Sequence, residues 1–211
     1  MIEINTITII GASNTSFVFD AYFMVVLRKQ CFKGANRLKT YTYKQPAAIE
    51  STEAVKILNE AGEVSSTVQR VYSNALKKAF DKTMDYRYFV RFDVHDRNGQ
   101  PLFTCKKVSR RGRVHFRGKD LVTGKDYMIA YDGWQIMIPD LVITDGEQQI
   151  KLNKEMEDWS VFTVNEQPIA RWQATFCETH FDITLQIEDS SPIQQEAFFI
   201  AIGQAVLFVG A

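Results

Sequence analysis

The last fifteen residues of the chain, Ala197 to Ala211, carry no charged side chain, and they constrain the fold more than any other segment. Just before them, Ser191-Pro192-Ile193-Gln194 places a side-chain acceptor ahead of a proline, which predicts the start of a helix. The residues that follow are apolar nearly all the way round such a helix instead of along one stripe. A helix of this kind has to be enclosed.

Two environments could enclose this helix, a membrane or a protein interior. A membrane span needs roughly 20 apolar residues. The uncharged run is shorter, contains Gln204 and has no basic flank to anchor it. We therefore expect a protein interior, such as the lumen of a wide β-barrel, and a tail-anchored membrane protein remains the alternative.

From about Thr40 onward the dominant pattern is β: short runs rich in β-branched and aromatic residues, separated by polar turns. Asn98-Gly99 and Asp145-Gly146 predict hairpins, since these residues tolerate the positive φ of type I′ turns. From Phe181 to Glu188, apolar and polar residues alternate, so one face of this strand is expected to face a core. A long meander tends to close on itself, which removes exposed edges.

The segment Ser73 to Lys82 breaks the β pattern and is interpreted as either a short helix or a connecting loop. The three tryptophans Trp134, Trp159 and Trp172 lie in strand-like stretches and are expected to anchor the core.

With these features the chain resembles the tubby C-terminal-like superfamily, which includes the LURP-one-related proteins and is related to phospholipid scramblases. The resemblance rests on the turns Asp96–Gly99 and Thr144–Gly146, on the strand leading into Asp189–Pro192 and on the terminal apolar helix Ile193–Val209, and it covers roughly residues 40–211. It implies a mainly β fold, a closed antiparallel barrel of about twelve strands around a central helix at residues 192–209. The best understood branch binds phosphoinositide headgroups through surface basic residues. No lipid-binding motif of that branch aligns with this chain, so no ligand residue is carried over.

The predicted domain organisation is a barrel at residues 41–211, preceded by an N-terminal segment, residues 1–40, of unclear role that packs on the barrel. This segment is apolar and then basic, and it matches no known pattern. It is the expected contact element for a second copy of the chain or for another protein partner.

Charge is unevenly distributed, although 25 basic and 25 acidic residues cancel overall. Between Arg91 and Lys119 there are nine basic residues and two acidic ones, whereas Asp132 to Asp189 holds twelve acids and three basic residues. Arginine and lysine side chains suit phosphate oxygens. The candidate anion-binding residues are Lys106, Lys107, Arg110, Arg111, Arg113, Arg117 and Lys119.

This basic region has three interpretations. It is a site for a phosphate-bearing ligand, a solvated hairpin tip, or a patch that pairs with the acidic half of the same barrel. Nucleic acid is a less favoured partner than lipid, because the flanking aromatics Phe103 and Phe116 are explained as strand core and no binding module is recognised.

No catalytic motif is found, and the sequence predicts no enzyme, no cofactor and no metal site. Gly112 to Asp120 resembles a phosphate loop but has five residues between its glycines, and an aspartate stands where serine or threonine would meet magnesium. His95, His115 and Cys105 could form a cluster only if their strands pair, and isolated histidines are much more common.

The cysteines Cys31, Cys105 and Cys177 are widely separated, so their spacing indicates no disulfide framework. The first residues lack the pattern of a secretory signal. We expect a cytoplasmic location, with peripheral attachment to a membrane as an open extension.

The predicted function is a non-enzymatic binding module that contacts anionic phospholipid or another phosphate-bearing ligand through the basic hairpin region. The alternative is a structural or regulatory domain for protein–protein interaction. The sequence identifies neither the ligand nor the oligomeric state.

Overall fold

The computed structural model describes residues 38–108, 115–132, 140–155 and 158–207 of the chain. These residues form twelve strands and two helices. In chain order the strands are β1 (Leu38–Pro46), β2 (Val55–Leu58), β3 (Val64–Arg70), β4 (Arg91–Asp96), β5 (Pro101–Lys107), β6 (His115–Asp120), β7 (Asp126–Asp132), β8 (Asp140–Thr144), β9 (Gln149–Asn153), β10 (Ser160–Val164), β11 (Gln167–Cys177) and β12 (His180–Glu188). The helices are α2 (Ala75–Lys82), between β3 and β4, and α3 (Glu196–Val206), after β12.

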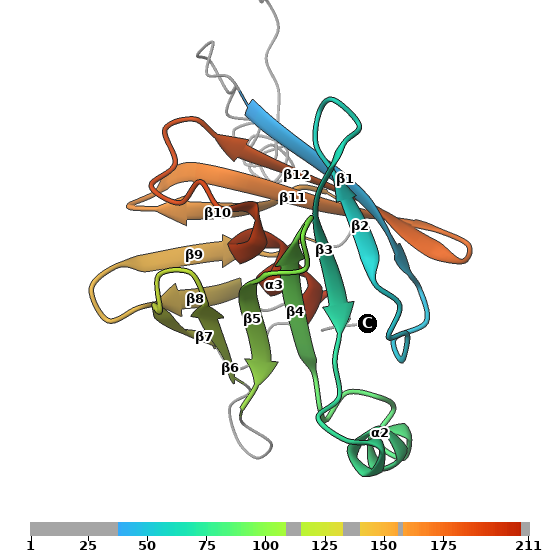
Figure 1. Ribbon diagram of the computed structural model, residues 1–211. Coiled ribbons are helices and arrows are strands. Elements are labelled where there is room, and N and C mark those ends of the chain that lie inside the picture. Colours follow the sequence, from blue (N-terminus) through green and yellow to red (C-terminus); the bar gives the residue numbers. More distant parts are fainter. Residues whose placement is uncertain (1–37, 109–114, 133–139, 156–157, 208–211) are drawn as a thin grey trace, which may run out of the picture. The chain divides into compact units, whose positions relative to one another are not determined.

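The strands form one closed antiparallel barrel in which each strand pairs with its neighbours in the chain (Figure 1). The barrel closes where β1 pairs with β12 along its whole length, from Leu38 opposite Glu188 to Pro46 opposite His180. The predicted mainly β fold, a twelve-stranded closed barrel with a C-terminal helix, is confirmed.

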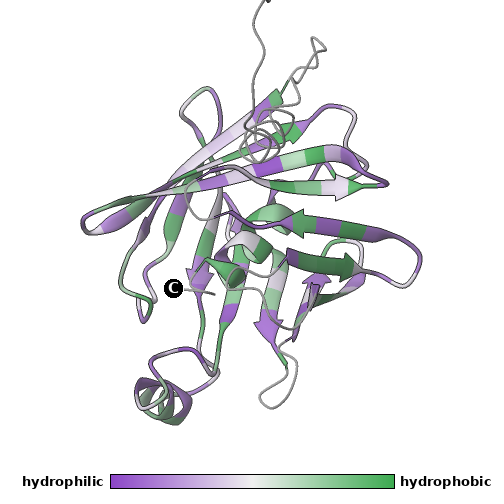
Figure 2. Cartoon of the chain, turned by 180° about the vertical axis from the view of Figure 1, so that it is seen from behind, coloured by the Kyte–Doolittle hydropathy of each residue, from purple (hydrophilic) through white to green (hydrophobic). Residues whose placement is uncertain are grey.

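Apolar and polar residues alternate along the strands, so the apolar side chains point into the barrel, where they surround α3. In β12, Ile183, Leu185 and Ile187 are buried, as their spacing predicts. From Ala197 to Val206, every residue of α3 is buried. Figure 2 shows the mostly hydrophobic colouring of α3 inside strands that alternate in hydropathy. The apolar helix is therefore enclosed by the protein interior.

Both predicted hairpins are present, but their turn type differs from the expectation. Gly99 and Gly146 have φ of 80° and 96°, whereas Asn98 and Asp145 are not in the positive-φ region. A type I′ turn needs two successive positive φ values. That pattern occurs at the β10–β11 turn, where Asn165 and Glu166 have φ of 48° and 65°.

The segment after β3 that the sequence left open is a helix. Asn74 is its N-cap, and the Asn74 side chain accepts a hydrogen bond from the Lys77 amide at 2.8 Å. This bond satisfies one of the amides that a helix start leaves unpaired.

The predicted start of the terminal helix at Ser191-Pro192 is wrong, because α3 begins at Glu196. Ser191 Oγ accepts a hydrogen bond from the amide of Ile193 at 3.2 Å and so stabilises a turn between β12 and the helix. The N-cap residue is Gln195, which makes no side-chain capping bond. The helix ends at Val206, and residues 208–211 lie outside the described residues.

A buried pair of hydrogen bonds connects α3 and β11 to β1, the strand at which the barrel closes. The hydroxyl of Tyr43 in β1 accepts hydrogen bonds from Trp172 Nε1 in β11 (3.3 Å) and from Gln204 Nε2 in α3 (3.1 Å). Burial raises the pKa of the Tyr43 hydroxyl to about 12. Next to Gln204, Gly203 lies against the indole of Trp172, so that a Cβ at this position would come within 2.9 Å of the ring.

The segment 1–37 lies outside the described residues, and the barrel begins with β1 at Leu38. The division of the chain near residue 40, and a role of residues 1–40 in partner contacts, therefore stay predictions. Of the predicted core tryptophans, Trp172 is buried, Trp159 is half-buried in the loop before β10, and Trp134 lies outside the described residues.

The Gly203 contact gives the first testable prediction. In an ordinary helix interior, glycine to alanine stabilises by about 1 kcal/mol. Here we expect Gly203→Ala to lower the free energy of unfolding by about 1–3 kcal/mol, because the added methyl overpacks against Trp172. Urea denaturation measures this change. A variant as stable as the wild type, or more stable, would contradict the described packing.

Candidate functional site

A buried carboxylate organises the end of the barrel near α2. Asp81, the one buried residue of α2, accepts hydrogen bonds from Arg70 NH2 (2.8 Å), from the Tyr72 hydroxyl (2.8 Å) and from the amides of Tyr88 (2.8 Å) and Phe89 (2.9 Å). Arg70 is buried too and also donates to the carbonyl groups of two loops. These bonds fasten α2 and the segment that follows it to the end of β3.

Beside this anchor lies an open groove of about 340 Å³, here called the basic groove. Its walls come from the segment after β3, from α2 and from the adjoining ends of β4 and β5. The described residues that line it are Val71, Tyr72, Ser73, Lys77, Phe89, Val90, Arg91, Lys106, Lys107 and Val108. Four of these residues are cationic and none is acidic.

Strand pairing brings three cations into one row on the outside of the barrel. Arg91 of β4 lies opposite Lys106 of β5, and Lys106 lies opposite Arg117 of β6. Like charges directly opposite each other destabilise a sheet. The row therefore has an electrostatic cost that a bound anion would offset.

The outer two cations of the row have acidic partners in the same strand or the adjoining one. Arg91 forms two hydrogen bonds to Asp93, at 2.9 and 2.8 Å, and Arg117 Nε lies 3.2 Å from Asp126 Oδ1. The hydrogen bond from Arg117 holds the pKa of the Asp126 carboxyl below its ordinary value. Within the described part of the chain, Lys106 has no such partner. Among the described cations of the basic region, Arg91 and Arg117 thus pair with local acids of β4 and β7, and none forms a salt bridge with the acidic half of the barrel.

Lys107 belongs both to the groove and to a second, deeper space. Its ammonium donates to the carbonyl of Arg87 at 2.8 Å, and burial lowers the pKa of Lys107. A cavity of about 180 Å³ lies inside this end of the barrel, and Lys107 and Val90 line it as they line the groove. The end of α3 also lines the cavity through Gln204, whose buried Oε1 accepts no hydrogen bond from any described residue.

The described members of the predicted anion-binding set do not all lie on one face of the sheet. Lys106, Arg117 and Lys119 lie exposed on the outer face of β5 and β6, while Lys107 points the other way. Arg110, Arg111 and Arg113 lie outside the described residues. Their assignment as ligand residues stays a prediction.

Sequence reasoning left two groove cations, Lys77 and Arg91, out of the candidate site. Lys77 donates to Ser73 Oγ at 2.7 Å and lies 5.6 Å from the centre of the Phe89 ring. The available signal was the three lysines of the Ser73–Lys82 segment, but the sequence alone does not show that this segment lies beside the end of β5.

Apolar side chains stand exposed next to the groove. Leu76 and Phe80 of α2 are 81% and 49% exposed, and Met84, four residues further on, is 46% exposed. Leu76 and Phe80 are four residues apart and therefore lie on one face of α2.

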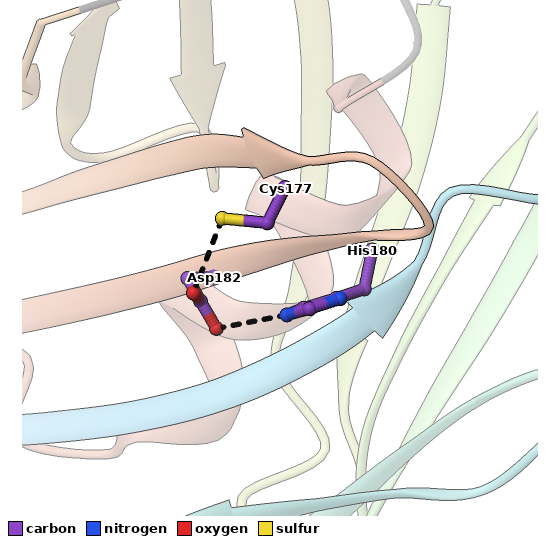
Figure 3. Close-up of side chains that lie close together, drawn as sticks. All are labelled: Cys177, His180 and Asp182. Atoms are coloured by element: carbon purple, nitrogen blue, oxygen red, sulfur yellow. Dashed lines mark hydrogen bonds and ion pairs between the residues drawn. The ribbon is translucent and has the colours of Figure 1, made fainter.

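The His95, His115 and Cys105 cluster that the sequence left open does not form. Cys105 points into the barrel and is fully buried, and burial raises its thiol pKa. The two histidines occupy outward-facing positions of β4 and β6. A different cluster, which sequence reasoning missed, lies at the β11–β12 hairpin, where Cys177, His180 and Asp182 approach one another (Figure 3).

The second prediction concerns the buried anchor. We expect Asp81→Ala to lower the free energy of unfolding by about 3–5 kcal/mol, because the change leaves the Arg70 charge buried and unpaired. Tyr72→Phe removes one of the four bonds and should cost only about 1 kcal/mol. Urea denaturation of both variants gives the comparison. Equal effects of the two changes would contradict the central role of the ion pair.

Comparison with known proteins identifies a family for this chain. The model of the Tubby C-terminal like domain matches residues 41–209. No curated protein and no solved structure matches the chain. Among the described residues, no helix has both the length and the apolar character needed to cross a membrane. Since the family model covers most of the chain, the protein belongs to the Tubby C-terminal-like domain family. This family is known in general for binding lipids, phosphoinositides among them, and is generally non-enzymatic.

Proposed function

We propose that this member of the Tubby C-terminal-like domain family is a non-enzymatic module that binds the phosphate-bearing headgroup of an anionic phospholipid in the basic groove. The observation that carries the proposal is the gathering of Lys77, Arg91, Lys106 and Lys107 around one space with no acid among its described lining residues.

The groove offers the chemistry that a phosphorylated headgroup needs. Lysine ammonium groups act as point charges toward phosphate oxygens, and they can turn toward a ligand on flexible stems. Lys106 is exposed, and within the described part of the chain an anion could engage it without breaking a salt bridge. Lys107 is partly desolvated already, which strengthens its attraction to an anion.

The apolar side chains of α2 favour a membrane lipid over a soluble phosphate compound. Leu76 and Phe80 belong to the same helix as Lys77, which lines the groove. An interfacial helix inserts apolar side chains among acyl chains while its basic residues meet anionic headgroups. On this geometry the α2 end of the barrel faces the membrane.

The third prediction tests the groove by charge reversal. We expect Lys106→Glu to weaken binding to vesicles that contain anionic lipid by about tenfold or more at low salt, since each basic residue near such a surface contributes about 1 kcal/mol. Co-sedimentation with vesicles measures the affinity. Competition by a soluble inositol phosphate distinguishes recognition of the headgroup from general surface attraction.

Lys151→Glu is the matched control. Lys151 is an exposed lysine on β9, in the acidic half of the barrel, and its reversal changes the net charge by the same amount. We expect this variant to bind like the wild type. If both variants lose the same affinity, the attraction is not localised in the groove, and equal binding of the wild type to neutral and anionic vesicles would refute the proposal.

The fourth prediction tests the orientation on the membrane. We expect Leu76→Ser to weaken vesicle binding by about tenfold, because burial of a leucine side chain is worth about 1.5–3 kcal/mol. Its effect on binding of a soluble inositol phosphate should be negligible. The control is Val122→Ser, which removes a side chain that is 66% exposed at the β6–β7 turn, at the other end of the barrel. A larger loss with Val122→Ser would place the contact at that end.

A further inference from the structure

The β11–β12 hairpin brings three metal-ligating side chains to one face. A two-residue turn at Glu178 and Thr179 connects the strands, and Cys177 and His180 form the closing pair. Asp182 lies two residues further along β12 and therefore points to the same side as His180. Figure 3 shows the thiol and the imidazole directed toward the carboxylate from its two sides.

Two of the three distances between the ligand atoms already match those around one small cation. Cys177 Sγ lies 3.3 Å from Asp182 Oδ2, and His180 Nε2 lies 3.3 Å from Asp182 Oδ1. All three ligand atoms lie within 4.8 Å of one another. Around a tetrahedral zinc ion, bond lengths of about 2.0 Å to nitrogen or oxygen and 2.3 Å to sulfur place neighbouring ligand atoms about 3.3–3.5 Å apart.

A neighbouring hydroxyl supports the imidazole in the orientation that a metal requires. Thr179 Oγ1 lies 3.4 Å from His180 Nδ1, the ring nitrogen that does not face the carboxylate. Metal-binding histidines commonly donate their second ring N–H to an acceptor, which fixes the tautomer and leaves Nε2 to bind the metal.

A cationic group already lies against two of the donors. The ammonium of Lys44, from the adjacent strand β1, is 3.4 Å from both Asp182 Oδ1 and His180 Nε2. Its side chain is 71% exposed, so it can turn away into solvent. Lys44 therefore competes with a metal ion for the same two ligands.

We propose that Cys177, His180 and Asp182 bind one Zn²⁺ ion, with a water molecule as the fourth ligand. The combination of thiolate, imidazole and carboxylate suits zinc and disfavours calcium and magnesium, which take oxygen ligands. On binding, the Cys177 thiol loses its proton to solvent as the Sγ–Zn bond forms, and the Lys44 ammonium moves away. The ion cross-links the tip of the hairpin, and its three ligands share no residue with the lining of the basic groove.

Metal titration of the full-length protein tests this site. The protein carries Cys31→Ser, which removes the thiol outside the described residues, and Cys105 is buried. We expect Zn²⁺ to bind with a stoichiometry of one and a micromolar or lower dissociation constant by calorimetry. Co²⁺ in its place should give the charge-transfer absorption of a thiolate ligand. Cys177→Ser should abolish this absorption, and Cys177→Ser and His180→Gln should each weaken Zn²⁺ binding at least tenfold.

Two further variants test whether the ion binds at this cluster and displaces Lys44. His115→Ala, which removes a histidine from β6, should leave zinc affinity unchanged. Lys44→Ala should increase zinc affinity several-fold, because it removes the competing ammonium, whereas a cluster that only stabilises the hairpin would show no such gain. Absence of zinc binding, or binding that Cys177→Ser and His180→Gln leave intact, would overturn the proposal.

Discussion

The structure depends on the enclosure of a helix that has no polar face. Because α3 is buried along its length, the twelve strands have to close around it, and the first strand has to pair with the last. Two features hold the closure together. Trp172 and Gln204 both donate a hydrogen bond to the Tyr43 hydroxyl, and Gly203 leaves room for the indole ring of Trp172. The same stretch of α3 lines the cavity at the α2 end of the barrel, so the position of the helix also determines the interior of that end.

The buried core around α3 is distinct from the surface that we propose as functional. The buried Arg70–Asp81 pair connects the end of β3 to α2 and to the segment after it, and in this way it holds the wall of the basic groove in place. The groove cations themselves lie at strand ends and on α2, where they cost the core little. The proposed metal site is independent of both, since its ligands belong to a single hairpin.

The barrel and its turns could be predicted because they are local patterns: alternation gives strands, glycines give turns, and the uncharged terminal run requires enclosure. The predicted start of α3 is wrong because Ser191 closes a turn with the Ile193 amide, and a local pattern cannot distinguish this turn from a helix cap. The groove depends on register, which places Arg91 beside Lys106 from the neighbouring strand, and on α2, which supplies Lys77. The members of the cluster around Cys177 are close in sequence. Their side chains lie on one face only because the two-residue turn places Cys177 opposite His180.

The central claim is that the α2 end of the barrel is a membrane-binding surface built on a closed barrel filled by α3. Hydrogen–deuterium exchange of the full-length protein, with and without vesicles that contain anionic lipid, tests it most directly. The account predicts that vesicles slow exchange at residues 71–78, 87–91 and 106–108, while α3 is strongly protected in both conditions and the β6–β7 turn is unchanged. Slowed exchange confined to the opposite end of the barrel, or unprotected α3 amides, would contradict it.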